Sequence, residues 1–163
     1  MEHAFSRIMA VFTAVLMFFL VPLVISIQRQ EHMIQLAIMQ DTVQFVDSVC
    51  NMGAMTEHMY EEYQNQIRRL QSGLDVHMVH TVNSLHVGEN GIEKIQKIRT
   101  EAELKDILQG QAEYLFQKGD YFWVEVRRNS PGLLQRFYEA LGIRETSDAH
   151  YVYYGGSIRY EIK

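Results

Sequence analysis

The stretch IMAVFTAVLMFFLVPLVISI, which runs from Ile8 to Ile27, decides the fold because it contains no charged residue. Its 20 residues would form a helix of roughly 30 Å, which matches the hydrocarbon core of a bilayer. Pro22 lies inside the run, where its ring removes one backbone hydrogen bond and favours a kink. The sequence therefore predicts a membrane-spanning helix at residues 8–27.

A cleaved signal peptide is the alternative for such a run near an N terminus. The run exceeds the usual signal core of roughly 7–15 residues, and its exit, Ile25-Ser26-Ile27-Gln28, offers no small-x-small cleavage site. We therefore expect a retained single-pass anchor, with residues 1–27 as tail and transmembrane helix. Arg7 and Arg29 flank the run and nearly balance the positive-inside signal, so an outside position of the C-terminal domain is favoured only slightly.

The rest of the chain is acidic and long enough to fold. The 163 residues carry 15 Lys and Arg against 20 Asp and Glu, a formal net charge of −5 at pH 7. A nucleic-acid-binding protein normally presents a basic face, so we expect no nucleic-acid partner. The single cysteine, Cys50, excludes an intrachain disulfide and a cysteine-based zinc or iron–sulfur site. Residues 28–163 are predicted to form one α+β domain outside the membrane.

The first helix is predicted to continue beyond the membrane. Residues 28–52 contain no Gly or Pro, and apolar side chains such as Phe45 and Val49 recur at helical spacing. Gly53 then supplies a C-terminal stop, and a second helix begins at Thr56 and extends through residue 70. The anchor and the first part of the domain are therefore expected to share one helix.

Beyond the second helix the pattern becomes that of strands. Segment 74–87 is rich in β-branched residues, and 121–127 alternates, with Phe122 and Val124 expected to face the core and Glu125 to face outward. The fold class is therefore α+β: a long N-terminal helix, transmembrane and extended beyond the membrane, followed by an antiparallel β-sheet with short helices. Segment 92–99 is ambiguous, and its isoleucine repeat every three residues suits a helical turn better than a strand. The remaining expectations are a short helix at 101–109, a hairpin turn at 117–120, a helix at 133–141, and a strand at 151–162 that Gly155-Gly156 interrupts as a hairpin turn or a bulge.

The chemically reactive residues form no recognisable catalytic or metal site in the sequence. His77, His80 and His86 lie on one predicted strand, but alternation places His77 on the opposite face from the other two. Cys50 lies near the C-terminal end of the first helix, where the dipole raises a thiol pKa, so we interpret it as a core thiol. No phosphate-binding loop, dinucleotide fingerprint or hydrolase motif is present. We expect no cofactor, no metal and no enzymatic activity.

Two sets of residues are candidates for protein contacts. Asp41 and Asp47 fall in the first helix beyond the membrane, either on a solvated face or against a neighbouring subunit or the sheet edge. Exposed aromatic side chains on a sheet face commonly mark a protein contact. A helix of the same domain that covers them is an equally good interpretation. The aromatic candidates are Tyr121, Trp123, Tyr151, Tyr153, Tyr154 and Tyr160.

Several short motifs together resemble one family. They are the proline-containing apolar helix with its long extension, Phe45-Val46-Asp47-Ser48-Val49, Met59-Tyr60-Glu61-Glu62-Tyr63, Asp75-Val76-His77-Met78-Val79-His80, Lys118-Gly119-Asp120-Tyr121-Phe122 and Tyr154-Gly155-Gly156-Ser157-Ile158-Arg159. From Ile8 onward the chain resembles small pilin-like membrane proteins of Gram-positive, mostly clostridial, bacteria. These proteins are found with tight-adherence (Flp/Tad-type) pilus systems and are similar to TadE/TadF-type minor pilins.

The resemblance implies a non-enzymatic component or assembly factor of a pilus-like apparatus at the cell surface. Its partners would be other pilin-like or pilus-assembly proteins, in a homo- or hetero-oligomer. The apolar helix is the assembly element in that family, and helices in lipid associate through close packing. The expected packing residues of the transmembrane helix are Phe12, Leu16, Phe19 and Leu20, beside Pro22.

One departure from the family concerns processing. Prepilins carry a glycine just before the apolar segment, whereas the first glycine of this sequence is Gly53. The departure favours a retained assembly factor or base component over a shaft subunit. The alternative function is a membrane-anchored extracellular ligand-binding or sensor domain. Such a domain should own a concave pocket with convergent polar groups, whereas a pilin-like head should present an open sheet and contact patches.

Overall fold

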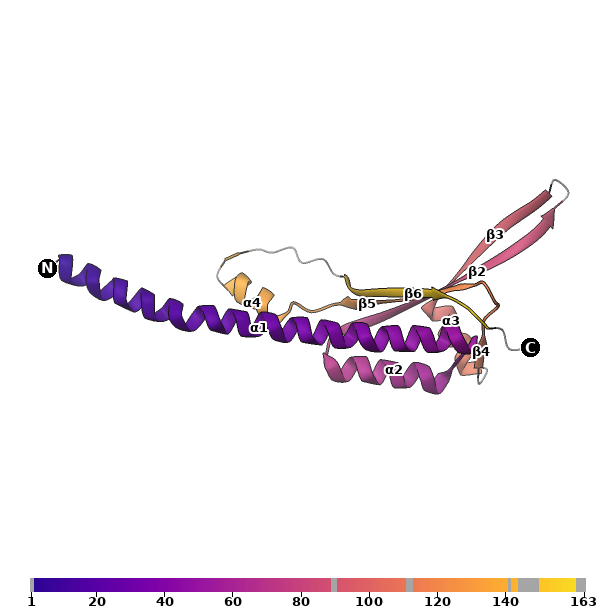
Figure 1. Cartoon of the computed structure of the whole chain (residues 1–163), viewed down its shortest axis with the longest axis horizontal. Helices are drawn as coiled ribbons and strands as arrows, with labels where there is room; N and C mark the ends of the chain where they lie inside the picture. The colour runs from indigo at the N-terminus through magenta and orange to yellow at the C-terminus, as the bar shows by residue number, and fades with distance from the viewer. Residues whose placement is uncertain (1, 89–90, 111–112, 141, 144–149, 161–163) are drawn as a thin grey trace. The chain divides into compact units, whose positions relative to one another are not determined.

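A computed structural model of the chain describes residues 2–88, 91–110, 113–140, 142–143 and 150–160 (Figure 1). The chain divides into two compact units, of which one comprises 1–34 and 131–147 and the other, here called the head unit, comprises 35–130 and 148–163. The layout is α+β, as predicted. In chain order the elements are α1 (Glu2–Met52), β1 (Ala54–Thr56), α2 (Glu57–Leu70), β2 (Leu74–Gly88), β3 (Gly91–Thr100), α3 (Glu101–Gly110), β4 (Glu113–Leu115), β5 (Tyr121–Arg128), α4 (Leu133–Ala140) and β6 (His150–Ser157).

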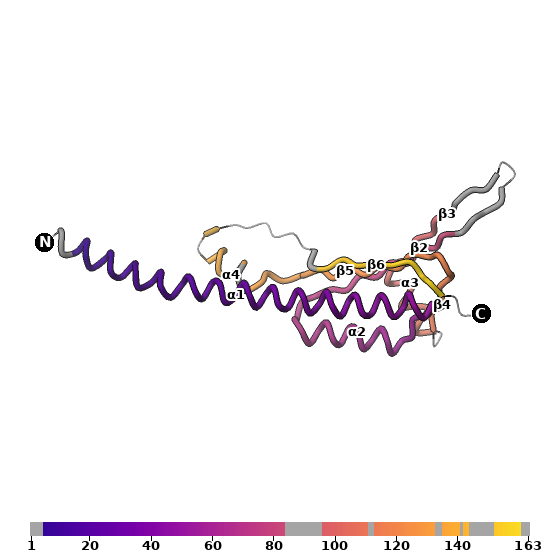
Figure 2. The backbone as a smooth tube through the Cα atoms, viewed as in Figure 1, coloured from indigo at the N-terminus to yellow at the C-terminus, as the bar shows by residue number. Residues whose placement is uncertain are grey.

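The first helix, α1, is unbroken over 51 residues although Pro22 lies inside it. It ends where Gly53 adopts a φ of 70°, a left-handed conformation that glycine tolerates without strain. The Gly53 N–H donates to the Val49 carbonyl at 2.8 Å. The backbone then turns back, so that α2 runs antiparallel to the end of α1 (Figure 2). The predicted continuation of the helix through residue 52 is confirmed.

The second helix, α2, begins at a side-chain cap and packs on α1 through an aromatic pair. The Thr56 hydroxyl accepts a hydrogen bond from the Met59 N–H at 3.2 Å, as the predicted helix start requires. Tyr63 stacks on Phe45 of α1 with ring centroids 4.3 Å apart and planes 6° from parallel. Its hydroxyl lies 2.8 Å from that of Thr42, which is fully buried. The hydroxyl pair therefore satisfies both polar groups inside the helix–helix contact.

A four-stranded antiparallel sheet in the order β3-β2-β5-β6 forms the second layer of the head unit. The inner face of this sheet is buried, and Phe45 of α1 lies edge-on to Phe122 of β5 at 6.2 Å. The predicted alternation of β5 is confirmed for Phe122, Val124 and Val126, none of which is exposed. A second sheet of two short antiparallel strands joins β1 to β4.

The helical turn predicted at 92–99 is wrong, because this segment is the strand β3. It pairs with β2 over ten residues, from Val79 opposite Thr100 to Gly88 opposite Gly91. The every-third isoleucine spacing favoured a helix, but the pairing with β2 satisfies the backbone of the segment instead. The sequence Gly88-Glu89-Asn90-Gly91 predicts a turn between these strands, of which residues 89 and 90 lie outside the described residues. The helices predicted at 101–109 and 133–141 are confirmed as α3 and α4, with residue 141 outside the described part.

The predicted hairpin turn at 117–120 is a turn but not a hairpin. The Asp120 N–H donates to the Gln117 carbonyl at 3.1 Å, and Gly119 has a φ of 93°. The strands on either side, β4 and β5, belong to different sheets. The turn therefore carries the chain from the small sheet to the large one.

Gly155 and Gly156 form neither a turn nor a bulge. The strand β6 continues through both, with Gly155 opposite Trp123 and Gly156 opposite Phe122, and the register shift lies instead at Val126/Arg127. A Cβ at Gly155 would lie 2.5 Å from the Trp123 Cβ, and one at Gly156 would lie 3.2 Å from the Cys50 sulfur. Glycine is needed here because side chains from two layers approach the strand closely.

We expect Gly155→Ala to lower the free energy of unfolding by about 1–3 kcal/mol, because the new methyl group overlaps Trp123. Chemical denaturation of the detergent-solubilised protein measures this loss. Gly110→Ala is the matched control, since nothing lies within 4 Å of a Cβ added there. Equal stability of the two variants would contradict the close approach at β6.

Candidate functional site

The first part of α1 exposes an apolar surface that water does not stabilise. Among the described residues, α1 is the one helix long and apolar enough to cross a membrane, and none of its most apolar window is buried. Phe12, Leu16 and Phe19 are 62%, 44% and 68% exposed, Pro22 is exposed, and Leu20 is half-buried. This surface suggests a membrane anchor, although a signal sequence near the N terminus has the same character.

The outer face of the large sheet, opposite α1, carries exposed aromatic and apolar side chains. Residues that pair across antiparallel strands share a face. Thr81 pairs with both Ile98 and Tyr121, and the neighbouring row pairs Trp123 with Val79. We call Ile98, Tyr121, Trp123 and Tyr153 the aromatic face; Ile98 is 62%, Tyr121 39% and Tyr153 59% exposed.

Trp123 is the centre of the aromatic face. It is half-buried, and its ring lies 5.0 Å from that of Tyr153 at an angle of 42°. The absence of a side chain at Gly155 leaves room for Trp123 on β5. Glu125 lies on the same outer face, as predicted, but it is only 5% exposed and lies 2.9 Å from Arg127. Cross-strand neighbours His77 and Tyr153 flank this carboxylate, which accounts for its burial.

Two of the predicted contact residues instead meet inside the head unit. Tyr154 lies on the inner face, and its hydroxyl donates to the Asp47 carboxylate of α1 at 3.5 Å. The expectation that Tyr154 faces outward is therefore wrong, because strand alternation places it opposite Tyr153. For Asp47 the sequence left open a solvated face or a contact with a neighbouring subunit or the sheet edge. The structure shows the contact with the sheet edge, because β6 is an edge strand. Asp41 is half-buried, and burial raises its pKa. The side chain of Tyr151 lies outside the described residues.

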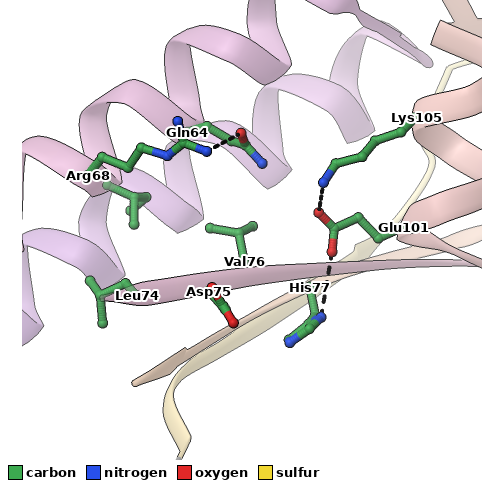
Figure 3. Close-up of a pocket in the computed structure, with 9 residues that line it drawn as sticks. Gln64, Arg68, Leu74, Asp75, Val76, His77, Glu101 and Lys105 are labelled. Carbon is green, nitrogen blue, oxygen red and sulfur yellow. Dashed lines mark hydrogen bonds and ion pairs between the residues drawn. The ribbon is translucent and has the colours of Figure 1, made fainter. Parts of the chain in front are cut away.

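A polar pocket of about 270 Å³ opens between α2, β2 and α3 (Figure 3). Glu101 is its central group and lies 2.6 Å from the Lys105 ammonium and 3.5 Å from His77 Nδ1. The Tyr60 hydroxyl also donates to Glu101, at 3.1 Å. Arg68 lines the opposite wall, where it donates to Gln64 at 3.4 Å. Both signs of charge are present, so the pocket favours neither a purely anionic nor a purely cationic ligand.

A buried polar chain, which the sequence did not predict, joins the two sheets. Arg99 donates to the Tyr114 oxygen at 2.7 Å, and this hydroxyl lies 2.7 Å from His80 Nδ1. His80 Nε2 lies 2.8 Å from the Asp120 carboxylate, and both side chains are 2% exposed. Asp120 also accepts from the backbone N–H of Asn83 at 3.1 Å. With so little exposure, the histidine–aspartate pair positions the turn before β5 and has no route to a substrate.

A neutral imidazole satisfies both contacts of His80: Nε2–H donates to Asp120, and Nδ1 accepts from the Tyr114 hydroxyl. Burial lowers the pKa of His80 below its ordinary value of 6.5, and although Asp120 opposes that shift, Arg99 adds to it. The histidine is therefore a structural hydrogen-bonding group at neutral pH.

We expect the free energy of unfolding to decrease as the pH falls below about 6.5, because the unfolded chain protonates His80 more readily than the folded chain does. Above that pH the stabilisation is fully present. Denaturation of the solubilised protein across this range measures the effect. His80→Gln should flatten the pH dependence, whereas His58→Gln, at an exposed position, should leave it intact. Identical pH profiles for wild type and His80→Gln would contradict this role.

Cys50 is a buried thiol, as predicted. It is 1% exposed, and burial, reinforced by Asp47, raises its pKa to about 11. We expect no alkylation of Cys50 by iodoacetamide in the folded protein at pH 8, and full alkylation in denaturant, as mass spectrometry would show. Rapid alkylation of the folded protein would contradict the packing of α1 on β6.

Comparison with protein-family models, curated proteins and solved structures finds no match to this chain. Among the described residues, no group of three or more His, Cys, Asp or Glu side chains could hold a metal ion. The features that remain for a function are the exposed apolar helix, the aromatic face and the polar pocket. Of the aromatic face, Tyr121, Trp123 and Tyr153 were among the contact residues predicted from the sequence, whereas Ile98 was not. The pocket was not predicted, because its walls come from three separate elements.

Proposed function

We propose that the chain is a single-pass, pilin-like membrane protein of a tight-adherence pilus system, acting as a retained assembly factor or base component. One observation carries this proposal. The helix α1 is exposed and apolar in its first part, and it continues without a break into residues that pack on an antiparallel sheet. An anchor that is also part of the head's core suits a subunit that holds a head at a membrane.

The head acts through contact rather than catalysis. Large exposed aromatic side chains are enriched at the centres of protein interfaces, and the aromatic face presents two tyrosines and a tryptophan on a rigid sheet. We place the head outside the cell, where the aromatic face binds another pilin-like or pilus-assembly protein. Packing of Phe12, Leu16, Phe19 and Leu20 against other pilin-like helices in the bilayer provides the second contact.

A membrane-anchored ligand-binding or sensor domain is the second candidate. The polar pocket at Glu101 favours it, because charged groups from three elements converge there. If this function is correct, isothermal titration calorimetry should show a candidate ligand binding to the wild type and binding more weakly to Lys105→Ala. At about 270 Å³ the pocket is small for a small-molecule site, so we rank the contact function first.

The test is mechanical shearing of intact native cells, followed by immunoblotting of the supernatant and the membrane pellet. We expect full-length protein in the pellet and loss of surface filaments from cells that carry Trp123→Ala with Tyr153→Ala. Tyr160→Ala is the control, because Tyr160 is 66% exposed but lies beyond β6. Protein in the sheared filaments would show a shaft subunit instead. Normal filaments on cells that lack the chain would refute the pilus function.

A further inference from the structure

The end of the head unit where α1 enters it gathers elements from several parts of the chain. α1 enters at Gln35 and runs to Met52, and α2 returns alongside it (Figure 1). The 2.8 Å contact between Thr42 and Tyr63 fixes the register of the two helices. The last residues of α2 therefore reach the level of Gln35. We call this end of the head unit the entry pole.

The entry pole carries four arginines. Arg68 and Arg69 form the last turn of α2, and Arg127 and Arg128 end β5. Strand pairing places Arg128 opposite Leu74, at the start of β2. A hydrogen bond links the ends of β5 and α2: Arg128 donates to Gln71, the residue that follows α2, at 3.2 Å. Elements that are distant in sequence therefore bring their basic ends to one place.

The acidic groups of α2 lie at its other end. The three glutamates Glu57, Glu61 and Glu62 occupy its first half. The helix dipole accounts for basic residues in the last turn of α2. A strand has only a small dipole, however, and β5 ends in the same charge. The carboxylates near the pole are Asp75, opposite Arg127 in the sheet, the buried Glu125, and Asp41, six residues beyond Gln35 on α1, so the four arginines exceed them. On the segment before Gln35, Glu31 is offset in charge by Arg29. The pole is therefore basic in a chain whose net charge is −5.

The chain itself limits how far the entry pole lies from the bilayer. The apolar run ends at Ile27, and seven residues, 28–34, precede Gln35. Even fully extended, seven residues span at most about 25 Å. Arginine binds phosphate through paired hydrogen bonds, and each basic group at an anionic bilayer surface strengthens binding roughly fivefold. A basic surface on so short a tether lies within reach of the anionic groups of that bilayer.

We propose that the entry pole is a lipid-contact surface, at which Arg68, Arg69, Arg127 and Arg128 bind the anionic phosphate groups of the membrane that holds α1. The contact fixes the head against the bilayer. It rests on α1 being a membrane anchor, which is one part of the proposed function, and it does not depend on the pilus partner.

The experiment uses the full chain in nanodiscs that contain a lipid with a nitroxide on its headgroup. A fluorophore is attached at Ser72→Cys, which is exposed at the entry pole, while the buried Cys50 remains unlabelled. We expect strong quenching in discs that contain phosphatidylglycerol, weaker quenching in pure phosphatidylcholine, and relief of the quenching at high salt. A fluorophore at Lys118→Cys, in the turn before β5, should remain unquenched in both lipids.

Charge reversal identifies the arginines. In the Ser72→Cys protein, Arg68→Glu with Arg69→Glu should lower the ratio of lipid-bound to free heads by roughly 25-fold or more, and the two glutamine substitutions should lower it less. Lys97→Glu with Lys118→Glu makes the same change in net charge at exposed positions away from the pole and should leave quenching intact. Circular dichroism checks that each variant is folded.

Two outcomes would overturn the lipid contact. Quenching at residue 72 that is equal in both lipids and insensitive to charge reversal would mean that the tether alone brings the pole near the bilayer. Absence of quenching in anionic discs would mean that the pole faces away from it. A chain that does not co-elute with the discs would instead contradict the anchor, so the two failures are distinguishable.

Discussion

The burial of the second part of α1 is the contact on which the rest of the structure depends. Ile38, Val46 and Val49 are completely buried, and each such side chain contributes about 1.5–3 kcal/mol of hydrophobic stabilisation. The same helix exposes its apolar side chains before residue 34. One helix therefore has an exposed apolar part and a buried part, and the head unit cannot be cut away within the second part of α1 without losing its own core.

Polar contacts inside the head unit connect the turn before β5, the segment after β6 and the end of α1. Asp120 anchors the turn before β5 through its side chain, and its carbonyl accepts the N–H of Ile158 at 2.8 Å. The next residue, Arg159, donates its N–H to the Cys50 carbonyl at 2.9 Å. The segment after β6 thus joins the buried histidine–aspartate pair to the C-terminal end of α1. These bonds satisfy a helix carbonyl that the intrahelical pattern leaves open.

Sequence patterns within one or two helical turns were enough to predict the helices. The features that the sequence did not predict depend on contacts between residues far apart in the chain. An absence of Gly and Pro over residues 28–52 marked the second part of α1, and Thr56 marked the start of α2, because both effects act within one turn of helix. The strand β3 was mistaken for a helical turn because its isoleucines repeat every three residues, while its partner β2 supplies the deciding hydrogen bonds. His80 and Asp120 are 40 residues apart, and no spacing rule connects them. The apolar run was predictable from composition, and Tyr121 and Trp123 from strand alternation, whereas Ile98 was missed and Tyr154 was placed on the wrong face.

The unbroken α1 also has a mechanical consequence. A head joined to its anchor by a flexible loop would let the loop lengthen first under a pull. Here a pull on the head acts along a helix whose far half is packed into the core. The strand β5, which carries Trp123, is hydrogen-bonded on both sides, to β2 and to β6, so tension along it loads many hydrogen bonds in shear at once. Under the proposed function, in which α1 is the anchor, this continuity would let the protein transmit force between whatever holds its outer sheet and the bilayer.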